Sequence, residues 1–259
     1  MICRLIAALG VLCVIQSSVC AQEQASGKRF LKWLTHDPVS FVNDFGANHL
    51  VTLGFSGVVF TTLSDFDERM SNQFRRRYNG NAYLDATNEF GTVRIMAPLA
   101  AAVFGTSLLS KDKHFQDAAF TSFQAVLYNQ LSVGALKYAF ARSRPYENDG
   151  SLNFNFFSSN GTSFPSGHTS TAFAVITPWI VYYPNVFTYS LLAVPAGTAL
   201  ARIAKGRHWL TDVTFGAAIG AYWGYYLSTK HLSLTKNTRF RFEPDVTFQS
   251  VGAKLHVSL

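Results

Sequence analysis

Long stretches without a charged residue alternate with short charged segments along most of the chain. The stretches are Phe45–Ser64, Ile95–Ser110, Ala118–Leu136, Thr169–Ala201 and Val213–Thr229. The longest of them contains the turn sequence YYPN and is therefore interpreted as two helices, which brings the number of expected helices to six. Most are rich in Ala, Gly, Ser and Thr, which lets helices approach closely. The pattern predicts an all-α protein built as a six-helix bundle.

The segments between and after these stretches have a different character. Leu63–Arg94 and Arg144–Thr162 are polar, and we expect loops or loops with short helices there. From Arg239 to Leu259 polar and apolar residues alternate, which is typical of half-buried strands. We therefore expect a helical domain over residues 45–232, preceded by an N-terminal segment over 22–44 and followed by a short strand-like tail over 233–259.

The first residues resemble an export signal. Arg4 precedes an apolar run, Leu5–Ile15, and a short polar region, Gln16–Ala21, ends in a small residue. We expect a signal peptide over residues 1–21, cleaved after Ala21. The alternative is a membrane anchor, although the apolar run is shorter than the ~20 residues that span a bilayer.

Charge and cysteine content narrow the chemistry. All three cysteines, Cys3, Cys13 and Cys20, lie in the expected signal, so the remaining chain would have no disulfide and no cysteine metal site. The net charge of +7 becomes +6 when Arg4 is removed, which suits anionic substrates or an anionic lipid surface, or solubility alone. The run Arg75–Arg77 is too short to suggest nucleic-acid binding.

Residues suited to binding phosphate lie at the ends of the apolar stretches. Lys137 and Arg144 occur in the sequence KYAFARSRP, and Arg202 occurs in RIAKGRHWLTD. Arginine has a planar fork that matches phosphate oxygens. Ser166 and Gly167, in the sequence PSGH, precede a helix whose free N–H groups favour an anion. These residues predict a phosphate site.

Two histidines add the means for a reaction. His208 and Asp212 are four residues apart, so the carboxylate can accept the Nδ1 proton and leave Nε2 free to attack phosphorus. His168 can give a proton to the leaving oxygen. Each feature alone could be a helix cap or a surface pair, but their joint occurrence favours an active site.

Together the three motifs resemble those of the type 2 phosphatidic acid phosphatase (PAP2) superfamily. They are Lys137 with Arg144 and Pro145, then Pro165–His168, then Arg202 with His208 and Asp212. The resemblance implies a bundle of the PAP2 or acid phosphatase type and a phosphohistidine mechanism without metal or cofactor. It implies that His208 is the nucleophile, that Asp212 orients it and that His168 is the general acid. The phosphate ligands it implies are Lys137, Arg144, Ser166, Gly167 and Arg202.

One departure from the family pattern is visible. Ala201 stands where a serine usually precedes the arginine of the third motif, so we expect a weaker phosphate contact rather than an inactive enzyme.

Several functions remain open. The favoured one is hydrolysis of a lipid-linked phosphate monoester or diphosphate, of the phosphatidic acid, phosphatidylglycerophosphate, polyprenyl diphosphate or lipid A type. The alternatives are an exported soluble acid phosphatase, a vanadium-dependent haloperoxidase, and a module that binds phosphate or lipid without catalysis.

The expected location follows from the signal and the helices. Six spans after a cleaved signal would place Lys137 in the cytoplasm, and Pro98, Pro178 and Pro195 interrupt the apolar stretches. We expect an exported bundle, periplasmic or attached to a membrane surface, with its active site outside the cytoplasm. Full membrane integration is the alternative.

The remaining candidates are expected to be structural. A surface or capping role is expected for His36, His49, His114, His231 and His256. Asp65, Asp67 and Glu68 are expected to begin a solvated helix. Trp209 is expected to pack in the interior, and Tyr146 is expected to lie in a loop.

Overall fold

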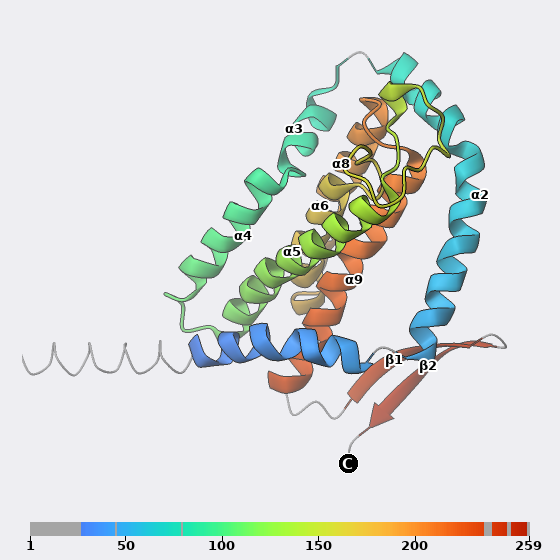
Figure 1. Cartoon of the computed structure of the whole chain (residues 1–259). Helices are drawn as coiled ribbons and strands as arrows, with labels where there is room; N and C mark the ends of the chain where they lie inside the picture. Colours follow the sequence, from blue (N-terminus) through green and yellow to red (C-terminus); the bar gives the residue numbers. More distant parts are fainter. Residues whose placement is uncertain (1–26, 45, 79, 236–239, 248–249, 258–259) are drawn as a thin grey trace, which may run out of the picture.

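The computed structural model describes residues 27–44, 46–78, 80–235, 240–247 and 250–257. Long helices run side by side, and a helix over residues 27–44 crosses the lower end of the bundle in Figure 1. The other helices are α2 (Ala47–Arg77), α3 (Ala82–Phe90), α4 (Val93–Ser107), α5 (Lys113–Phe140), α6 (Gly167–Tyr182), α7 (Val186–Ser190), α8 (Ala193–Ala204) and α9 (Leu210–Thr235). This architecture confirms the predicted all-α bundle.

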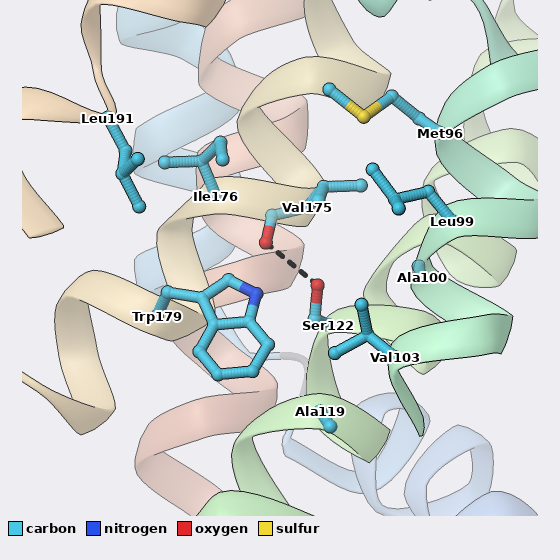
Figure 2. Close-up of a pocket in the computed structure, with 10 residues that line it drawn as sticks. All are labelled: Met96, Leu99, Ala100, Val103, Ala119, Ser122, Val175, Ile176, Trp179 and Leu191. Carbon is cyan, nitrogen blue, oxygen red and sulfur yellow. Dashed lines mark hydrogen bonds between the residues drawn. The ribbon is translucent and has the colours of Figure 1, made fainter. Parts of the chain in front are cut away.

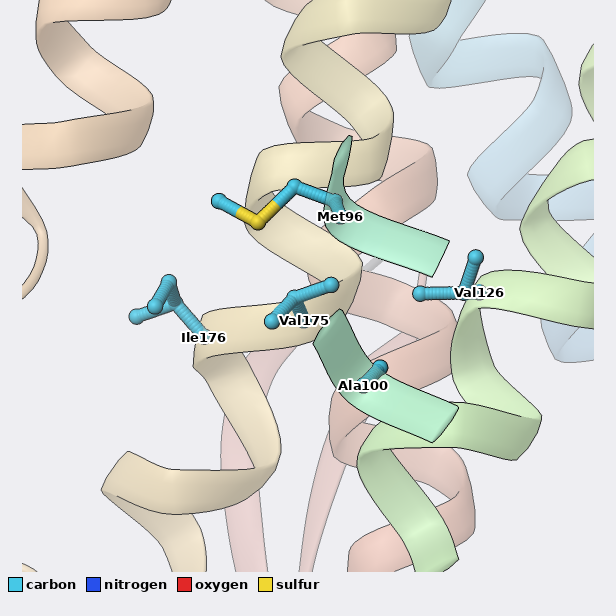
Figure 3. Close-up of a cluster of buried hydrophobic side chains, with 5 residues drawn as sticks. All are labelled: Met96, Ala100, Val126, Val175 and Ile176. Carbon is cyan, nitrogen blue, oxygen red and sulfur yellow. The ribbon is translucent and has the colours of Figure 1, made fainter. Parts of the chain in front are cut away.

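The centre of the bundle is formed by α5, α6 and α9 (Figure 1). Glycines on α9 let it lie directly against α6, because a Cβ atom at Gly220 would come within 2.1 Å of the carbonyl oxygen of Ser170. On the other side of α6, small and branched side chains from α4, α5 and α6 interlock in a core cluster (Figure 3). Its buried members are Met96, Ala100, Val126, Val175 and Ile176.

Local signals set both ends of α5. Its first turn is capped by Asp112, whose side chain accepts from the N–H groups of His114 and Phe115 at 2.9 and 3.2 Å. At the other end Ala141 adopts a left-handed conformation, with φ of 41°, and its N–H donates to the carbonyl of Lys137 at 2.8 Å. The chain therefore leaves the helix sharply just before the segment that contains Arg144.

Several boundaries differ from the sequence prediction. α2 continues to Arg77, beyond the expected end at Ser64, and in this second half Asp67 forms a buried ion pair with Arg142. The short helix α3 lies in the segment expected to hold loops with short helices. The turn YYPN does separate α6 from α7, as predicted. The helix over residues 27–44 had no counterpart in the sequence prediction.

The expected tail is a hairpin. Strands β1 (Phe240–Thr247) and β2 (Ser250–Val257) pair antiparallel, with Phe240 opposite Val257. The expected signal peptide over residues 1–21 lies outside the described residues, as do the side chains of His49 and His256.

The expectation of a surface or capping role for His231 is wrong. Its ring is fully buried, with Nδ1 2.8 Å from Oγ1 of Thr121 and Nε2 2.9 Å from Oδ2 of Asp37. Trp33 stacks on the ring at 4.0 Å between centroids. The helix over residues 27–44 thus docks on the bundle through a buried polar pair covered by aromatic rings. His36 on the same helix is exposed, as expected.

Two segments have the length and hydropathy of membrane spans, by composition alone. Within the described part of the chain, the helical stretch Val186–Ala204 is long and apolar enough to cross a membrane, with a mean hydropathy of 1.4. The helices Ala82–Phe90 and Val93–Ser107, which are bent by 63° relative to each other, are long and apolar enough only when they are taken together as one span.

Candidate active site

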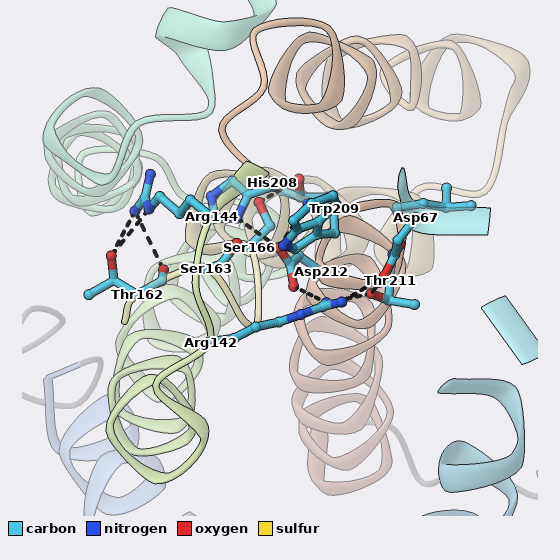
Figure 4. A network of polar contacts seen from close by, with 12 residues as sticks. Asp67, Arg142, Arg144, Thr162, Ser163, Ser166, His208, Trp209, Thr211 and Asp212 are labelled. Carbon is cyan, nitrogen blue, oxygen red and sulfur yellow. Dashed lines mark hydrogen bonds and ion pairs between the residues drawn. The ribbon is translucent and has the colours of Figure 1, made fainter. Parts of the chain in front are cut away.

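The three sequence motifs come together at one end of the bundle, where α5 ends and α6 and α9 begin (Figures 1 and 4). The backbone N–H of Ser166 donates to the carbonyl oxygen of Asp212 at 2.9 Å, which joins the second motif directly to the third. Ser163, just before the second motif, also donates its hydroxyl hydrogen to the Asp212 carboxylate.

Both cations of the first motif contact the loop that leads into the second motif. Lys137 lies in the last turn of α5, and its ammonium group donates to the carbonyl oxygen of Thr162. The guanidinium of Arg144 donates to the hydroxyl of the same residue, Nη2 to Oγ1, at 2.9 Å (Figure 4). The two cations are therefore turned toward the same part of the site.

The N-terminus of α6 faces these cations. Ser166 is its fully buried N-cap residue, and its side chain makes no capping bond but lies 3.0 Å from the hydroxyl of Thr169. A Cβ atom at Gly167 would lie 3.7 Å from Cε of Lys137, so the lysine stem passes next to the first turn of α6. The N–H groups of that turn have no partner within the helix and can bind an anion.

Arg202 completes the cationic set from the last turn of α8. Its Nη1 donates to Oδ1 of Asn88 on α3 at 3.0 Å, whereas its buried Nε has no hydrogen-bond partner. Asn88 was not identified from the sequence, since nothing local links it to the third motif. Arg202 therefore keeps a donor available for a ligand. Ala201, the departure from the family pattern, is fully buried.

The pKa values indicate how closely these groups face each other. The pKa of His168 is lowered to about 4 by burial and then by three cations, Arg202, Arg144 and Lys137. Burial, together with the charges of Arg144 and Arg202, also lowers the pKa of Lys137 to about 7, although Asp212 opposes this shift. Mutual repulsion of this kind is relieved by an anion bound between the groups.

The remaining pair, His208 and Asp212, is fully enclosed. Nδ1 of His208 lies 3.4 Å from Oδ2 of Asp212, a long contact without full hydrogen-bond geometry. Contacts of this kind often shorten when substrate binds. Burial lowers the pKa of His208 to about 3, which outweighs the opposing effect of the Asp212 carboxylate, so the ring is neutral at neutral pH.

Asp212 stays ionised in this enclosed position. Burial alone would raise the pKa of Asp212, but the contact with His208 and the charge of Arg142 lower it to about 2. Its Oδ2 atom also accepts from the backbone N–H of Trp209 at 2.9 Å. Trp209 is buried and donates its indole N–H to the carbonyl of Ser143 at 2.8 Å, so the expected packing role is confirmed.

The expectation that Asp67 belongs to a solvated helix is wrong. Its side chain is fully buried and lies 2.7 Å from the guanidinium of Arg142 (Figure 4). Sequence analysis missed Arg142 as well, although it lies between the two cations of the first motif. Charged residues hidden inside the bundle look like surface residues when only the local sequence is read.

Two other expectations concern Tyr146 and His114. Tyr146 lies in a one-turn 3-10 helix, Pro145–Glu147, where the guanidinium of Arg207 lies 5.3 Å from its ring centroid. The Nε2–H group of His114 donates to the carbonyl oxygen of Tyr182 at 2.9 Å, away from the three motifs. Among the described residues, no group of three or more His, Cys, Asp or Glu side chains could hold a metal ion.

A pocket of about 210 Å³ lies elsewhere, between α4, α5 and α6 (Figure 2). Its lining is almost entirely apolar, and the hydroxyl of Ser122 is bound at 2.8 Å to the carbonyl oxygen of Val175. None of its lining residues belongs to the three motifs. The pocket therefore contributes no polar group to the candidate active site.

Part of the chain is similar in sequence to known proteins. Residues 118–236 match the model of the PAP2 superfamily. The chain is 32% identical over 155 residues to a lipid A 1-phosphatase of Porphyromonas gingivalis, over 58% of this chain and 32% of that protein. It is 28% identical over 127 residues to a lipid A 1-phosphatase of Rhizobium etli, over 48% of this chain and 53% of that protein. The chain thus spans between a third and about half of these curated relatives.

Two solved structures are similar. The first transmembrane PAP2 type phosphatidylglycerolphosphate phosphatase from Bacillus subtilis is 19% identical, with a TM-score of 0.55 over 71% of this chain and 97% of that one. LpxE of Aquifex aeolicus is 19% identical, with a TM-score of 0.49 over 62% of this chain and 94% of that one. The first likeness shows that the fold is shared.

Proposed function

Because residues 118–236 match the model of the PAP2 superfamily, we propose that the chain is a phosphatase that acts on a lipid-linked phosphate through a phosphohistidine. One observation carries the proposal. The cations Lys137, Arg144 and Arg202 all depress the pKa of His168, so four basic groups from the three motifs face one small space. A phosphoryl group is the ligand that best satisfies such a space beside a helix N-terminus.

In the first step, Nε2 of His208 attacks phosphorus, and the bond from phosphorus to the ester oxygen breaks. The bound phosphate dianion raises the pKa of His168, so that the ring takes up a proton. His168 gives this proton to the departing oxygen, so the alcohol or phosphate leaves protonated. Asp212 accepts from Nδ1 and stabilises the positive charge that forms on the ring. The three cations and the N–H group of Gly167 hold the phosphoryl oxygens, whose charge spreads in the transition state, whereas the N–H of Ser166 is already bound to the carbonyl oxygen of Asp212.

In the second step, a water molecule attacks the phosphohistidine. His168, now neutral, accepts a proton from that water, and the bond from phosphorus to Nε2 of His208 breaks. Inorganic phosphate then leaves, and both histidines return to their starting states. No step needs a metal, so the proposed reaction continues in a chelator.

A lipid-linked substrate is supported by the surroundings of the site and by the names of the relatives. The loop between the first two motifs exposes apolar side chains, with Leu152 65%, Phe156 59% and Phe157 72% exposed. Exposed apolar groups next to a phosphate site suit a ligand with an acyl chain. Both curated relatives are named lipid A 1-phosphatases, so a phosphorylated lipid of the lipid A type is the first substrate to test.

We also propose that the protein is held at a membrane with the site outside the cytoplasm. The expected signal and the exposed apolar loop support this location. Extraction of membranes with carbonate tests the attachment, since a peripheral protein is released and an integral one stays.

The decisive experiment measures phosphate release by the purified chain in EDTA. The substrates are lipid A, phosphatidic acid, phosphatidylglycerophosphate, a polyprenyl diphosphate and a soluble aryl phosphate. His208→Ala should abolish release, whereas the exposed His36→Ala should leave it unchanged. Preference for the aryl phosphate would favour a soluble acid phosphatase instead.

Other outcomes would contradict the proposal. Peroxide-dependent halide oxidation after addition of vanadate, without phosphate release, would identify a haloperoxidase. Phosphate binding that persists without turnover of any substrate would identify a binding module.

A further inference from the structure

Arg142 is a buried arginine whose hydrogen-bonding capacity is fully used. Its Nε donates to the carbonyl of Ser151 at 2.7 Å, and one N–H of Nη2 donates to the same oxygen. The other N–H of Nη2 donates to Asp67 at 2.7 Å. Nη1 donates to Thr211 at 2.6 Å and to Asp212 at 2.7 Å. All five N–H groups of the guanidinium therefore have acceptors in the protein.

The surroundings of Arg142 exclude a role as a phosphate ligand. Its side chain is fully buried, and the rings of Phe60, Phe154 and Trp209 lie 5.4, 5.3 and 5.7 Å from its central carbon. In this enclosed position no donor is left for a substrate. Arg142 thus differs from Arg202, whose Nε is unpartnered.

Asp67 holds Arg142 from the opposite side. Its Oδ2 atom accepts from Arg142 and from the hydroxyl of Thr211 at 2.7 Å each, and Oδ1 accepts from the N–H of Thr211 at 2.9 Å. Thr211 lies directly before Asp212. Through Asp67, α2 therefore binds both the guanidinium of Arg142 and the first turn of α9. Figure 4 shows the guanidinium between Asp67 and Asp212.

The two carboxylates share one cation in an enclosed setting. Oδ1 of Asp212 is bound by Arg142, which leaves Oδ2 to face Nδ1 of His208 at 3.4 Å. Without a fixed cation, a buried carboxylate lowers its energy by rotating toward other donors or by taking up a proton. Either change would remove the acceptor that selects the tautomer of His208.

We propose that Asp67 and Arg142 are positioning residues, whose ion pair fixes the carboxylate of Asp212 so that it holds His208 with its proton on Nδ1. This inference rests on the proposed phosphatase function. It extends the site to α2, which lies outside the segment that matches the PAP2 superfamily. The role is indirect, because neither side chain reaches the phosphate space.

The variants that test this pair keep its shape. Asp67→Asn preserves the size of the side chain but removes the charge that holds Arg142. Arg142→Lys preserves the positive charge but cannot reach both carboxylates with a planar fork. Glu68→Gln is the matched control, because it makes the same chemical change one residue away, where the side chain is exposed and accepts from the N–H of Ser151 at 3.2 Å.

The first readout is independent of activity. In the full chain with 15N-labelled histidine, NMR reports which ring nitrogen of His208 carries the proton, and His208→Gln identifies its signals. We expect an Nδ1-protonated ring in the unchanged protein and in Glu68→Gln. In Asp67→Asn and Arg142→Lys we expect a mixture of tautomers.

The second readout is kinetic. We expect kcat to fall about 10- to 100-fold in Asp67→Asn and Arg142→Lys, as for other residues that orient a ligand or catalyst indirectly. KM should change less than about two-fold, because the phosphate ligands are untouched. If the charge of Asp67 matters more than the planar fork of Arg142, the larger fall in kcat is expected for Asp67→Asn. A larger fall in either of the two variants supports a positioning role.

The inference is overturned if both variants keep the Nδ1 tautomer and a kcat equal to that of Glu68→Gln, even when their melting temperatures fall. That result would leave the pair with a structural role only. Failure of the proposed phosphatase function is distinguishable, because the unchanged protein would then release no phosphate while the tautomer readout still tests the positioning of His208.

Discussion

The backbone N–H of Ser166 donates to the carbonyl oxygen of Asp212 at 2.9 Å. This bond joins the start of α6, with the proposed phosphate ligand Gly167, to the first turn of α9, where Asp212 faces the proposed nucleophile His208. The spacing between this ligand and the nucleophile depends on how closely the two helices approach. Any change that separates α6 from α9 should therefore affect the reaction as well as the stability.

Gly220→Ala should disturb this approach. The added Cβ would meet the carbonyl oxygen of Ser170 at 2.1 Å, so α9 must shift away from α6. We expect a loss of about 1–3 kcal/mol in the free energy of unfolding, as for other overpacked sites, and a lower kcat. Denaturant unfolding and phosphate release measure the two effects.

Gly134→Ala is the control for that change. Gly134 lies in α5 with nothing within 4 Å of an added Cβ, so alanine there should be neutral or stabilise the helix by about 0.5–1 kcal/mol. Equal behaviour of the two variants would contradict the idea that close packing of α6 and α9 sets the site.

Asn88→Ala should weaken substrate binding. The amide oxygen of Asn88 orients Arg202 at 3.0 Å, and its removal leaves that guanidinium free to move. We expect KM and the dissociation constant for inorganic phosphate to rise about 10-fold, which corresponds to ~1.4 kcal/mol. Calorimetry and steady-state kinetics measure both constants.

Asn81→Ala provides the comparison on the same helix. Asn81 caps α3 by accepting from the N–H of Leu84 at 3.0 Å and does not contact Arg202. It should lower the stability of α3 with little change in phosphate affinity. A similar rise in KM for both variants would indicate that α3 as a whole, rather than the amide of Asn88, positions Arg202.

Phosphate binding should take up protons. Burial and the neighbouring cations lower the pKa of Lys137 to about 7 and the pKa of His168 to about 4. A bound dianion offsets the repulsion from the cations and raises both pKa values. Near pH 7, where Lys137 is about half protonated, titration calorimetry in buffers of different ionisation enthalpy should show net uptake. Proton release on binding would contradict this arrangement.

Acid should destabilise the fold over a defined range. Burial lowers the pKa of His208 to about 3, so between its ordinary value of 6.5 and about 3 only the unfolded chain takes up this proton. The free energy of unfolding should fall as pH is lowered through that range. Asp212, with its pKa lowered to about 2, adds stability above pH 3.8 that is lost as pH falls toward 2.

The measurement is the melting temperature at several pH values from 7 to 4. His208→Gln removes one buried group that resists protonation, so its stability should depend less on pH in this range. An identical pH dependence in the variant and the unchanged protein would show that His208 is not the group responsible.

Local sequence was enough to find most of the candidate site. Lys137, Arg144, His168, Arg202 and His208 each stand at the end of an apolar stretch, where a helix end can present them. Their places near helix ends follow from short-range rules of helix start, helix end and spacing. The periodicity of apolar residues predicted the helices over most of the bundle, and the alternating pattern predicted the strands of the tail.

Other residues could not be interpreted in this way. Asp67 and Arg142 lie 75 positions apart, and each looks like a solvated charge among its sequence neighbours. His231 likewise gave no sign of its contact with Asp37, which lies 194 positions away. The partner that makes burial of such a group favourable comes from a different helix.

The sequence by itself therefore determined the helices, their order and the residue types that a phosphoryl reaction needs. Only the tertiary structure decided which charges are enclosed, which of them hold Asp212, and how α2 and α3 support the site. The physical reason is that helix periodicity depends on neighbours in the chain, whereas the energy of a buried charge depends on partners that packing brings from elsewhere.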